Sequence, residues 1–160
     1  MQTAPLQLRH LTIDRLLLET EADGNAENAD IAETAVQVGP IASSTEQPAL
    51  WHIGLAIRVS PGEGGRRGPY TIDVHLSGLF EVTDIDAPEA EVARIVAVNG
   101  ASILYSAVRE HVWLLTSRCK WGSFSLPTMS FFGLDVTKDP PVEIDTRAGD
   151  PQVGNVQQAE

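Results

Sequence analysis

The side chains that most often do chemistry are few in this chain and far apart. The histidines are His10, His52, His75 and His111, and Cys119 is the only cysteine. None of them is spaced from another as ligands on one helix or strand face would be, so a zinc site would need distant elements to converge. We therefore expect no metal site and no cofactor.

Two further patterns resemble functional motifs only superficially. The glycine-rich stretch 62–65 leads through residues 66–69 into a strand, whereas a phosphate-binding loop leads into a helix, so a hairpin connection is the better interpretation. Ser117 and Lys120 have Ser-x-x-Lys spacing, but the partner motifs of the acyl-transfer enzymes that use this spacing are absent. The sequence therefore predicts no catalytic residue and no enzyme activity.

The composition is that of an acidic globular domain. The chain has 160 residues, 42% of them apolar, which is enough for a single core. Its net charge of -11 disfavours nucleic acid and anionic membranes as partners and leaves a basic protein or peptide as the alternative. We interpret Glu81, Asp84 and Asp86 as an exposed strand end and a helix N-cap, and not as a cation site or an acid/base pair.

The location expected from the sequence is the cytoplasm. The first residues, 1–5, lack the basic start and apolar stretch of a secretory signal, and no apolar run is long enough for a membrane span. A single cysteine cannot form an internal disulfide, which fits a reducing compartment.

Alternating apolar residues predict an antiparallel sheet. The clearest strand has apolar residues at every second position from Trp51 to Val59. The other predicted strands span 6–19, 35–41 and 70–82. We expect the leucines at 16–18 to be covered on both faces, a bend at Gly39 and Pro40, and a bulge at residues 77–78, where the alternation slips. Residues 21–33 are predicted to form a mobile polar connection.

Two helices are predicted after the strands. A short one begins at Asp86 and carries a narrow apolar stripe, and a turn at Asn99 and Gly100 separates it from the main helix at about 102–117. Apolar residues cover more of the main helix than one sheet can bury, so we expect it to pack on another chain as well. The residues predicted for this oligomer interface are Leu104, Val108, His111, Val112 and Leu115.

The order of these features resembles that in the SecB export chaperones. An Asn-Gly turn at 99–100, the phrase Ile-Leu-Tyr with Arg-Glu at 103–110, a helix and a Leu-Pro exit at 126–131 follow one another as in that family. Residues 77–80 are similar to its Gly-Gly-Leu-Phe phrase. The resemblance implies an α+β fold, with a four-stranded antiparallel sheet and a long C-terminal helix at the interface of a tetramer or dimer.

The resemblance also implies a function. SecB proteins are ATP-independent holdases that bind unfolded preproteins and deliver them to the SecA motor, without a cofactor. The acidic positions that contact SecA fall on Glu19 and Asp73, while Asp14 lies beside a third position that Arg15 occupies. The reversed charge at Arg15 counts against a SecA contact.

The client groove of the family falls on apolar residues from two parts of this chain. The corresponding positions are Val36, Val38, Ile41, Trp51, Leu126, Met129, Phe131, Phe132 and Leu134. Each of them is equally compatible with an ordinary core position.

The C-terminal part differs from the family. Gly133, Asp135 and Pro140–Pro141 leave little room for the helix that usually follows, so we divide the chain into a domain at 1–138 and a disordered polar tail at 139–160. The shortening favours, as an alternative, a dedicated chaperone of the antitoxin in a toxin–antitoxin pair. A second alternative is an oligomeric adaptor that has the fold without chaperone activity.

Overall fold

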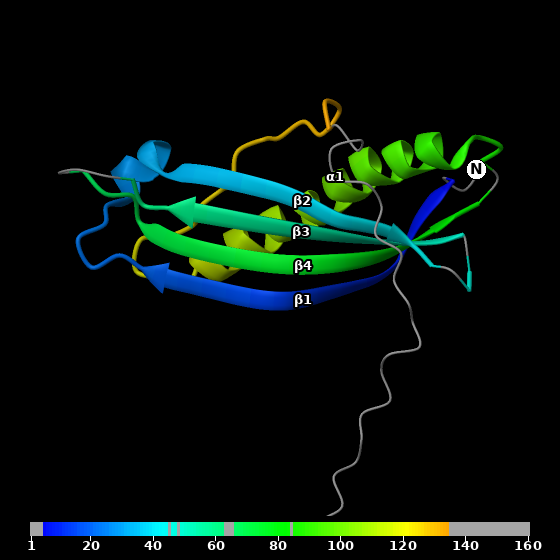
Figure 1. Ribbon diagram of the computed structural model, residues 1–160. Coiled ribbons are helices and arrows are strands. Elements are labelled where there is room, and N and C mark those ends of the chain that lie inside the picture. The colour runs from blue at the N-terminus through cyan, green and yellow to red at the C-terminus, as the bar shows by residue number, and fades with distance from the viewer. Residues whose placement is uncertain (1–4, 45, 48, 63–65, 84, 135–160) are drawn as a thin grey trace, which may run out of the picture.

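The protein forms one antiparallel sheet with a long helix on one face (Figure 1). The computed structural model describes residues 5–134 except 45, 48, 63–65 and 84, so the predicted tail at 139–160 and the end of the predicted domain lie outside the described residues. The elements are β1 (Leu6–Thr20), the 3-10 helix η1 (Ala26–Ile31), β2 (Glu33–Ser43), β3 (Leu50–Ser60), β4 (Tyr70–Val82) and α1 (Glu89–Thr116). The strand order is β1-β4-β3-β2, which confirms the predicted α+β fold class.

The two central strands form the floor of the core. In β3 and β4 alternate side chains are buried against α1, and the pairing of the two strands runs without interruption from Leu50 to Val59. The predicted bulge at residues 77–78 is wrong, because Gly78 keeps the alternation and takes a place on the buried face between Leu76 and Phe80. The predicted strand around Trp51 is confirmed, and the Trp51 side chain is buried.

The bulges lie in β1 instead. The register between β1 and β4 shifts after Leu8 and again after Ile13, so Arg9 and Asp14 are extra residues in the strand. Each bulge changes the phase of the strand by one residue and returns the next apolar side chain to the helix side. The residues of β1 that share this side are Leu6, Leu8, Leu11, Ile13, Leu16 and Leu18. Leu16 and Leu18 lie on the helix side, while Leu17 pairs with Asp73 on the opposite face. The expectation that both faces are covered is wrong, since Leu16 is exposed.

The second edge strand, β2, is bent where the sequence predicted. Its register against β3 shifts between Val38 and Ile41, and Gly39 has a φ of 137°, a conformation that side-chain-bearing residues rarely adopt. The polar connection before β2 contains the helix η1, whose first turn is capped because Asn25 Oδ1 accepts a hydrogen bond from the Glu27 amide at 3.0 Å.

One continuous helix replaces the two that were predicted. The helix α1 runs through Asn99 and Gly100 without a turn, and it begins after Pro88 without a side-chain cap, so Asp86 is not its N-cap. The Asn99 side chain donates to the Ile95 carbonyl within the helix. The helix is long and apolar enough to cross a membrane by length and composition, but it packs on all four strands, as the core helix of a globular protein does.

Two glycines allow α1 to approach the sheet closely. A methyl group on Gly100 would overlap the Cδ1 atom of Ile53, a fully buried residue of β3. A methyl group on Gly78 of β4 would lie 2.7 Å from the Phe80 ring and 2.8 Å from Leu104 Cδ2. These glycines therefore serve close packing, and this is why neither marks a turn or a bulge.

The chain turns back after α1 and continues as an extended segment, residues 123–134, which we call the strap. At the turn Trp121 Nε1 donates to the Glu21 carbonyl at 2.9 Å, and the Tyr70 hydroxyl donates to the Gly122 carbonyl at 2.5 Å. Gly122 has a φ of 78°. In Figure 1 the strap is the yellow to orange segment that runs back from the C-terminal end of α1.

Thr116 joins the end of α1 to the strap. It is completely buried, its hydroxyl donates to the Val112 carbonyl at 2.7 Å, and the same oxygen accepts from the Phe124 amide at 2.8 Å. A single hydroxyl thus satisfies a buried amide that no regular element would satisfy.

We expect Gly100→Ala to lower the free energy of unfolding by about 1 kcal/mol, because overpacking costs about 1–3 kcal/mol and the better helix propensity of alanine returns about 1 kcal/mol. Ile53→Val removes the overlapping atom, so the double variant should lose less stability than the two single variants together. Urea unfolding measures all three variants. A Gly100→Ala protein more stable than the wild type would contradict the close approach.

Thr116→Val keeps the shape of the side chain and leaves the buried Phe124 amide without an acceptor. We expect a loss of about 1–3 kcal/mol in the free energy of unfolding. The control is Ser117→Ala, since the Ser117 hydroxyl is exposed and donates only to the Leu114 carbonyl of its own helix. Equal urea midpoints for the two variants would rule out the role given to Thr116.

Candidate functional site

The predicted client-groove residues all lie on the helix side of the sheet or on the strap, but they differ in exposure. Four of them belong to the buried core: Ile41, Trp51, Leu126 and Phe131. Three are partly buried against that core: Val36, Val38 and Leu134. Only Met129 and Phe132 are well exposed, at 40% and 75%. Among the predicted groove residues, the exposed apolar surface thus lies on the strap.

The strap is held on α1 by hydrogen bonds to its backbone and by its buried apolar side chains. The Tyr105 hydroxyl donates to the Pro127 carbonyl at 2.7 Å, and Arg109 Nε donates to the Leu126 carbonyl at 3.2 Å. The Phe131 ring meets the Tyr105 ring edge to face, with centroids 5.5 Å apart. Tyr105 and Arg109 are four residues apart, so one face of the helix provides both donors.

Tyr105 is fixed as a neutral donor. Burial raises the pKa of its phenol above the ordinary value, and the nearby Arg109 guanidinium opposes that effect only in part. The hydroxyl therefore keeps its proton at physiological pH and remains able to donate to the strap carbonyl.

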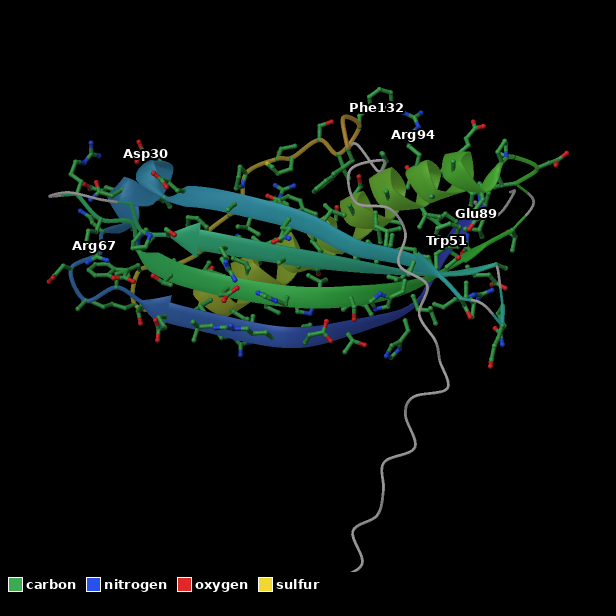
Figure 2. The ribbon with its side chains drawn as sticks, in the orientation of Figure 1. Asp30, Trp51, Arg67, Glu89, Arg94 and Phe132 are labelled. Atoms are coloured by element: carbon green, nitrogen blue, oxygen red, sulfur yellow. The ribbon has the colours of Figure 1, made fainter. Side chains whose placement is uncertain are left out.

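The far end of the strap leaves an aromatic ring in solvent. Arg94 lies about three turns before Tyr105 on the same side of α1, and its guanidinium carbon is 6.0 Å from the centre of the Phe132 ring. Figure 2 shows Phe132 and Arg94 beside each other on the side of the molecule turned away from the strands. Such a cation–π contact is weak at an exposed site, so Phe132 is available to an apolar partner.

The residues predicted for the oligomer interface also fall into a buried group and an exposed group. Leu104, Val108 and Val112 are buried against the sheet within the subunit, although Val108 and Val112 also line the narrow groove between β1 and α1. His111 and Leu115 are exposed, and His111 Nδ1 lies 2.8 Å from the Ala107 carbonyl of the same helix. The prediction placed these residues on one stripe, whereas the helix turns part of that stripe towards its own sheet.

The outer side of α1 carries apolar residues that the prediction did not assign to an interface. Trp113 and Leu114 are about half exposed, at 52% and 51%, and Ile103 is also exposed. The sequence indicated these residues only in that apolar residues cover more of the helix than one sheet can bury. Which of them are exposed becomes evident once the side of α1 that faces the sheet is known.

The exposed part of β1 adjoins this helix surface. Leu8, Ile13 and Leu16 point to the helix side but α1 leaves them uncovered. A narrow apolar groove lies between β1 and α1, lined by Leu11, Ile13, Leu16, Val74, Leu76, Ala107, Val108, His111 and Val112. An exposed apolar patch of this kind is typical of a protein–protein contact.

The acidic positions do not form one acidic surface. The Asp73 carboxylate is mostly buried and is shared by Arg15 Nη2 at 3.2 Å, Arg58 Nε at 3.5 Å and His75 Nε2 at 2.9 Å. Asp14 lies in a bulge of β1, and Glu19 is exposed near the end of that strand. The structure thus surrounds Asp73 with basic groups, and the Arg15 that replaces an acid contributes one of them.

The side chains considered for catalysis are engaged elsewhere. Ser117 donates to the Leu114 carbonyl, while Lys120 Nζ lies over the Trp121 ring at 4.0 Å from its centre. Within the described part of the chain, no group of three or more His, Cys, Asp or Glu residues lies close enough to hold a metal ion. The glycine-rich residues 63–65 and Asp84 lie outside the described residues.

Comparison with known proteins connects this geometry to one fold. No protein-family model and no curated protein matches the sequence. Among solved structures, a SecB-like chaperone of Mycobacterium tuberculosis, in complex with a ChAD peptide from the HigA1 antitoxin, has a TM-score of 0.58 at 17% identity. The match covers 79% of this chain and 91% of that chain. A Streptococcus agalactiae protein of unknown function has a TM-score of 0.47 at 14% identity, covering 77% of this chain and 97% of that one. The chain thus has the fold of the SecB-like chaperones.

Proposed function

We propose that this protein is an ATP-independent chaperone that binds non-native polypeptides at the strap and associates with itself through α1 and β1. The observation that carries the proposal is the amount of large apolar surface that one subunit leaves in water. The exposed large apolar residues of the described chain are Leu8, Ile13, Leu16, Ile103, Trp113, Leu114, Leu115, Met129 and Phe132. They lie on two surfaces, which matches two kinds of partner.

The client surface is the apolar end of the strap. Phe132 and Met129 offer contacts to any apolar segment, and neither requires a particular client sequence. Binding the unfolded state removes it from aggregation by mass action, which needs neither a catalytic group nor ATP. We place this activity in the cytoplasm, where a lone cysteine stays reduced.

The client class follows from two observations. The structural neighbour from M. tuberculosis was solved with a peptide of an antitoxin, which supports a dedicated antitoxin chaperone as one form of the proposal. Delivery of preproteins to SecA would need an acidic docking surface, but Asp73 is shared by three basic side chains. We therefore favour the antitoxin-dedicated form over general export.

Self-association is the second part of the proposal. The side of α1 that lines the narrow groove and the uncovered apolar residues of β1 form the centre of the surface proposed for this contact. A second copy would cover this surface with residues of the same kind, since most homo-oligomers use the same patch on both subunits. A dimer or a dimer of dimers would satisfy this requirement, and an adaptor without a client surface would satisfy it equally well.

The client surface is tested with the double variant Met129→Ser and Phe132→Ser. We expect it to lose most of the protection that the wild type gives an unfolded model protein at equimolar ratio, because two exposed apolar contacts of about 1–3 kcal/mol are removed. Light scattering during aggregation gives the readout. Phe132 is chosen over Phe131 because Phe131 is buried and its replacement would also damage the fold.

The matched control is the double variant Trp113→Asp and Leu114→Asp, which changes the self-association surface and leaves the strap as it is. Wild-type protein that does not delay aggregation at all would refute the chaperone and leave the adaptor, whereas loss of protection in the control alone would place clients on α1.

The self-association surface is tested with Trp113→Asp and Leu114→Asp, which also serve as this control. We expect the mass from light scattering to fall to that of one subunit, because two charged groups would have to be desolvated in the interface. The strap double variant should keep the wild-type mass. A wild-type protein that is already monomeric would contradict this part of the proposal.

A further inference from the structure

We propose that the strap occupies its place on α1 as a built-in substitute for a client, and that an unfolded polypeptide displaces it. The proposal deepens the proposed function and rests on it, since it concerns the regulation of the same surface. The protein would then cover its deeper apolar surface with its own residues until a client arrives.

The first argument is the way in which α1 holds the strap. Two consecutive carbonyl groups accept from α1: that of Leu126 from Arg109 Nε at 3.2 Å, and that of Pro127 from the Tyr105 hydroxyl at 2.7 Å. Carbonyl groups are common to every polypeptide, so the same two donors would hold any extended chain. Side chains that bind a backbone while pockets take up side chains are the usual way to recognise extended peptides.

The second argument is the pattern of burial along the strap. Phe124 and Leu126 are buried and Ser125 and Pro127 between and after them are exposed, which is the alternation of an extended chain lying on a surface. The strap has neither helix nor strand structure between residues 123 and 131. It therefore gives up no regular hydrogen-bond ladder when it leaves.

The third argument is the weak attachment of the far end. Beyond the buried Phe131 the chain makes a turn, in which the Leu134 amide donates to the Phe131 carbonyl at 3.1 Å. Phe132 and Met129 are exposed on either side of Phe131. A client that first contacts these two residues would lie beside Phe131, whose contact with Tyr105 is among those that it has to replace.

On displacement, each contact of the strap would be replaced by a client contact of the same kind. The donors of α1 would pass from the strap carbonyls to client carbonyls, and apolar client side chains would take the places of Leu126 and Phe131. Because the strap competes, the observed client affinity is the intrinsic affinity reduced by the fraction of molecules in which the strap is displaced. Loosening the strap should therefore strengthen client binding.

The test uses the full chain and a permanently unfolded probe, reduced carboxymethylated α-lactalbumin. Phe131→Leu keeps an apolar side chain in the strap, removes the aromatic contact with Tyr105 and leaves both donors of α1 in place. An edge-to-face aromatic pair is worth about a factor of five in an equilibrium constant, so we expect the variant to bind the probe about fivefold more tightly. The control is Ser125→Ala, since Ser125 is an exposed residue of the same strap. Equal or weaker binding by Phe131→Leu would overturn the proposal.

A second measurement uses the wild type, so it does not depend on how a variant folds. Amide hydrogen exchange of residues 124–131 should become faster when the probe is added at saturation, while exchange in β3 stays unchanged. Slower or unchanged exchange in the strap would also overturn the displacement. If the wild type does not bind the probe at all, the proposed function itself fails, whereas binding with an undisturbed strap refutes only this inference.

Discussion

The close contact between α1 and the centre of the sheet sets the position of everything else in the subunit. Gly100 lies against Ile53, and Gly78 lies under Leu104, so the helix axis is brought nearer to β3 and β4 than residues with side chains would allow. The helix also packs on the edge strands, but it leaves part of β1 uncovered. The exposed leucines and isoleucine of β1 follow from this position, as does the space on the other side of α1 that the strap fills.

The strap depends on the same helix in a second way. Once one stripe of α1 is committed to the sheet, the neighbouring stripe presents Arg94, Tyr105 and Arg109 to the returning chain. Thr116 and Tyr70 fix where that return begins, through hydrogen bonds to Phe124 and Gly122. The strap is thus firmly attached at Phe124, whereas its other end carries the exposed ring of Phe132. This gradient of attachment along one segment is the structural basis of both proposals.

The sequence predicted the elements whose signal is a periodicity. The alternation in β3 and the Gly-Pro bend of β2 need only local information, and the structure confirms both. Gly78 and Gly100 were interpreted as a bulge and a turn, because a glycine has the same local signature whether it permits a turn or a close approach. Which of the two applies is decided by a partner residue far away in the chain, and for Gly100 that residue is Ile53.

The candidate site was predictable in its location and not in its surface. Phe131 and Phe132 are adjacent and chemically identical, yet one is buried and the other is mostly in solvent. An irregular segment has no period from which to tell them apart. The residues predicted for the oligomer interface differ in burial for a related reason: the helix is apolar on several sides, and only the position of the sheet shows which side is used internally.

Both edges of the sheet are interrupted, and this has a consequence for a protein that would work among aggregating chains. The bulges at Arg9 and Asp14 divide β1 into short regular stretches, and the bend at Gly39 divides β2. An intact edge is a template onto which stray polypeptides add as further strands, and fibrils grow in this way. A growing strand would lose its register within a few residues on either edge here. The interruptions therefore lower the tendency of both edges to take up further strands.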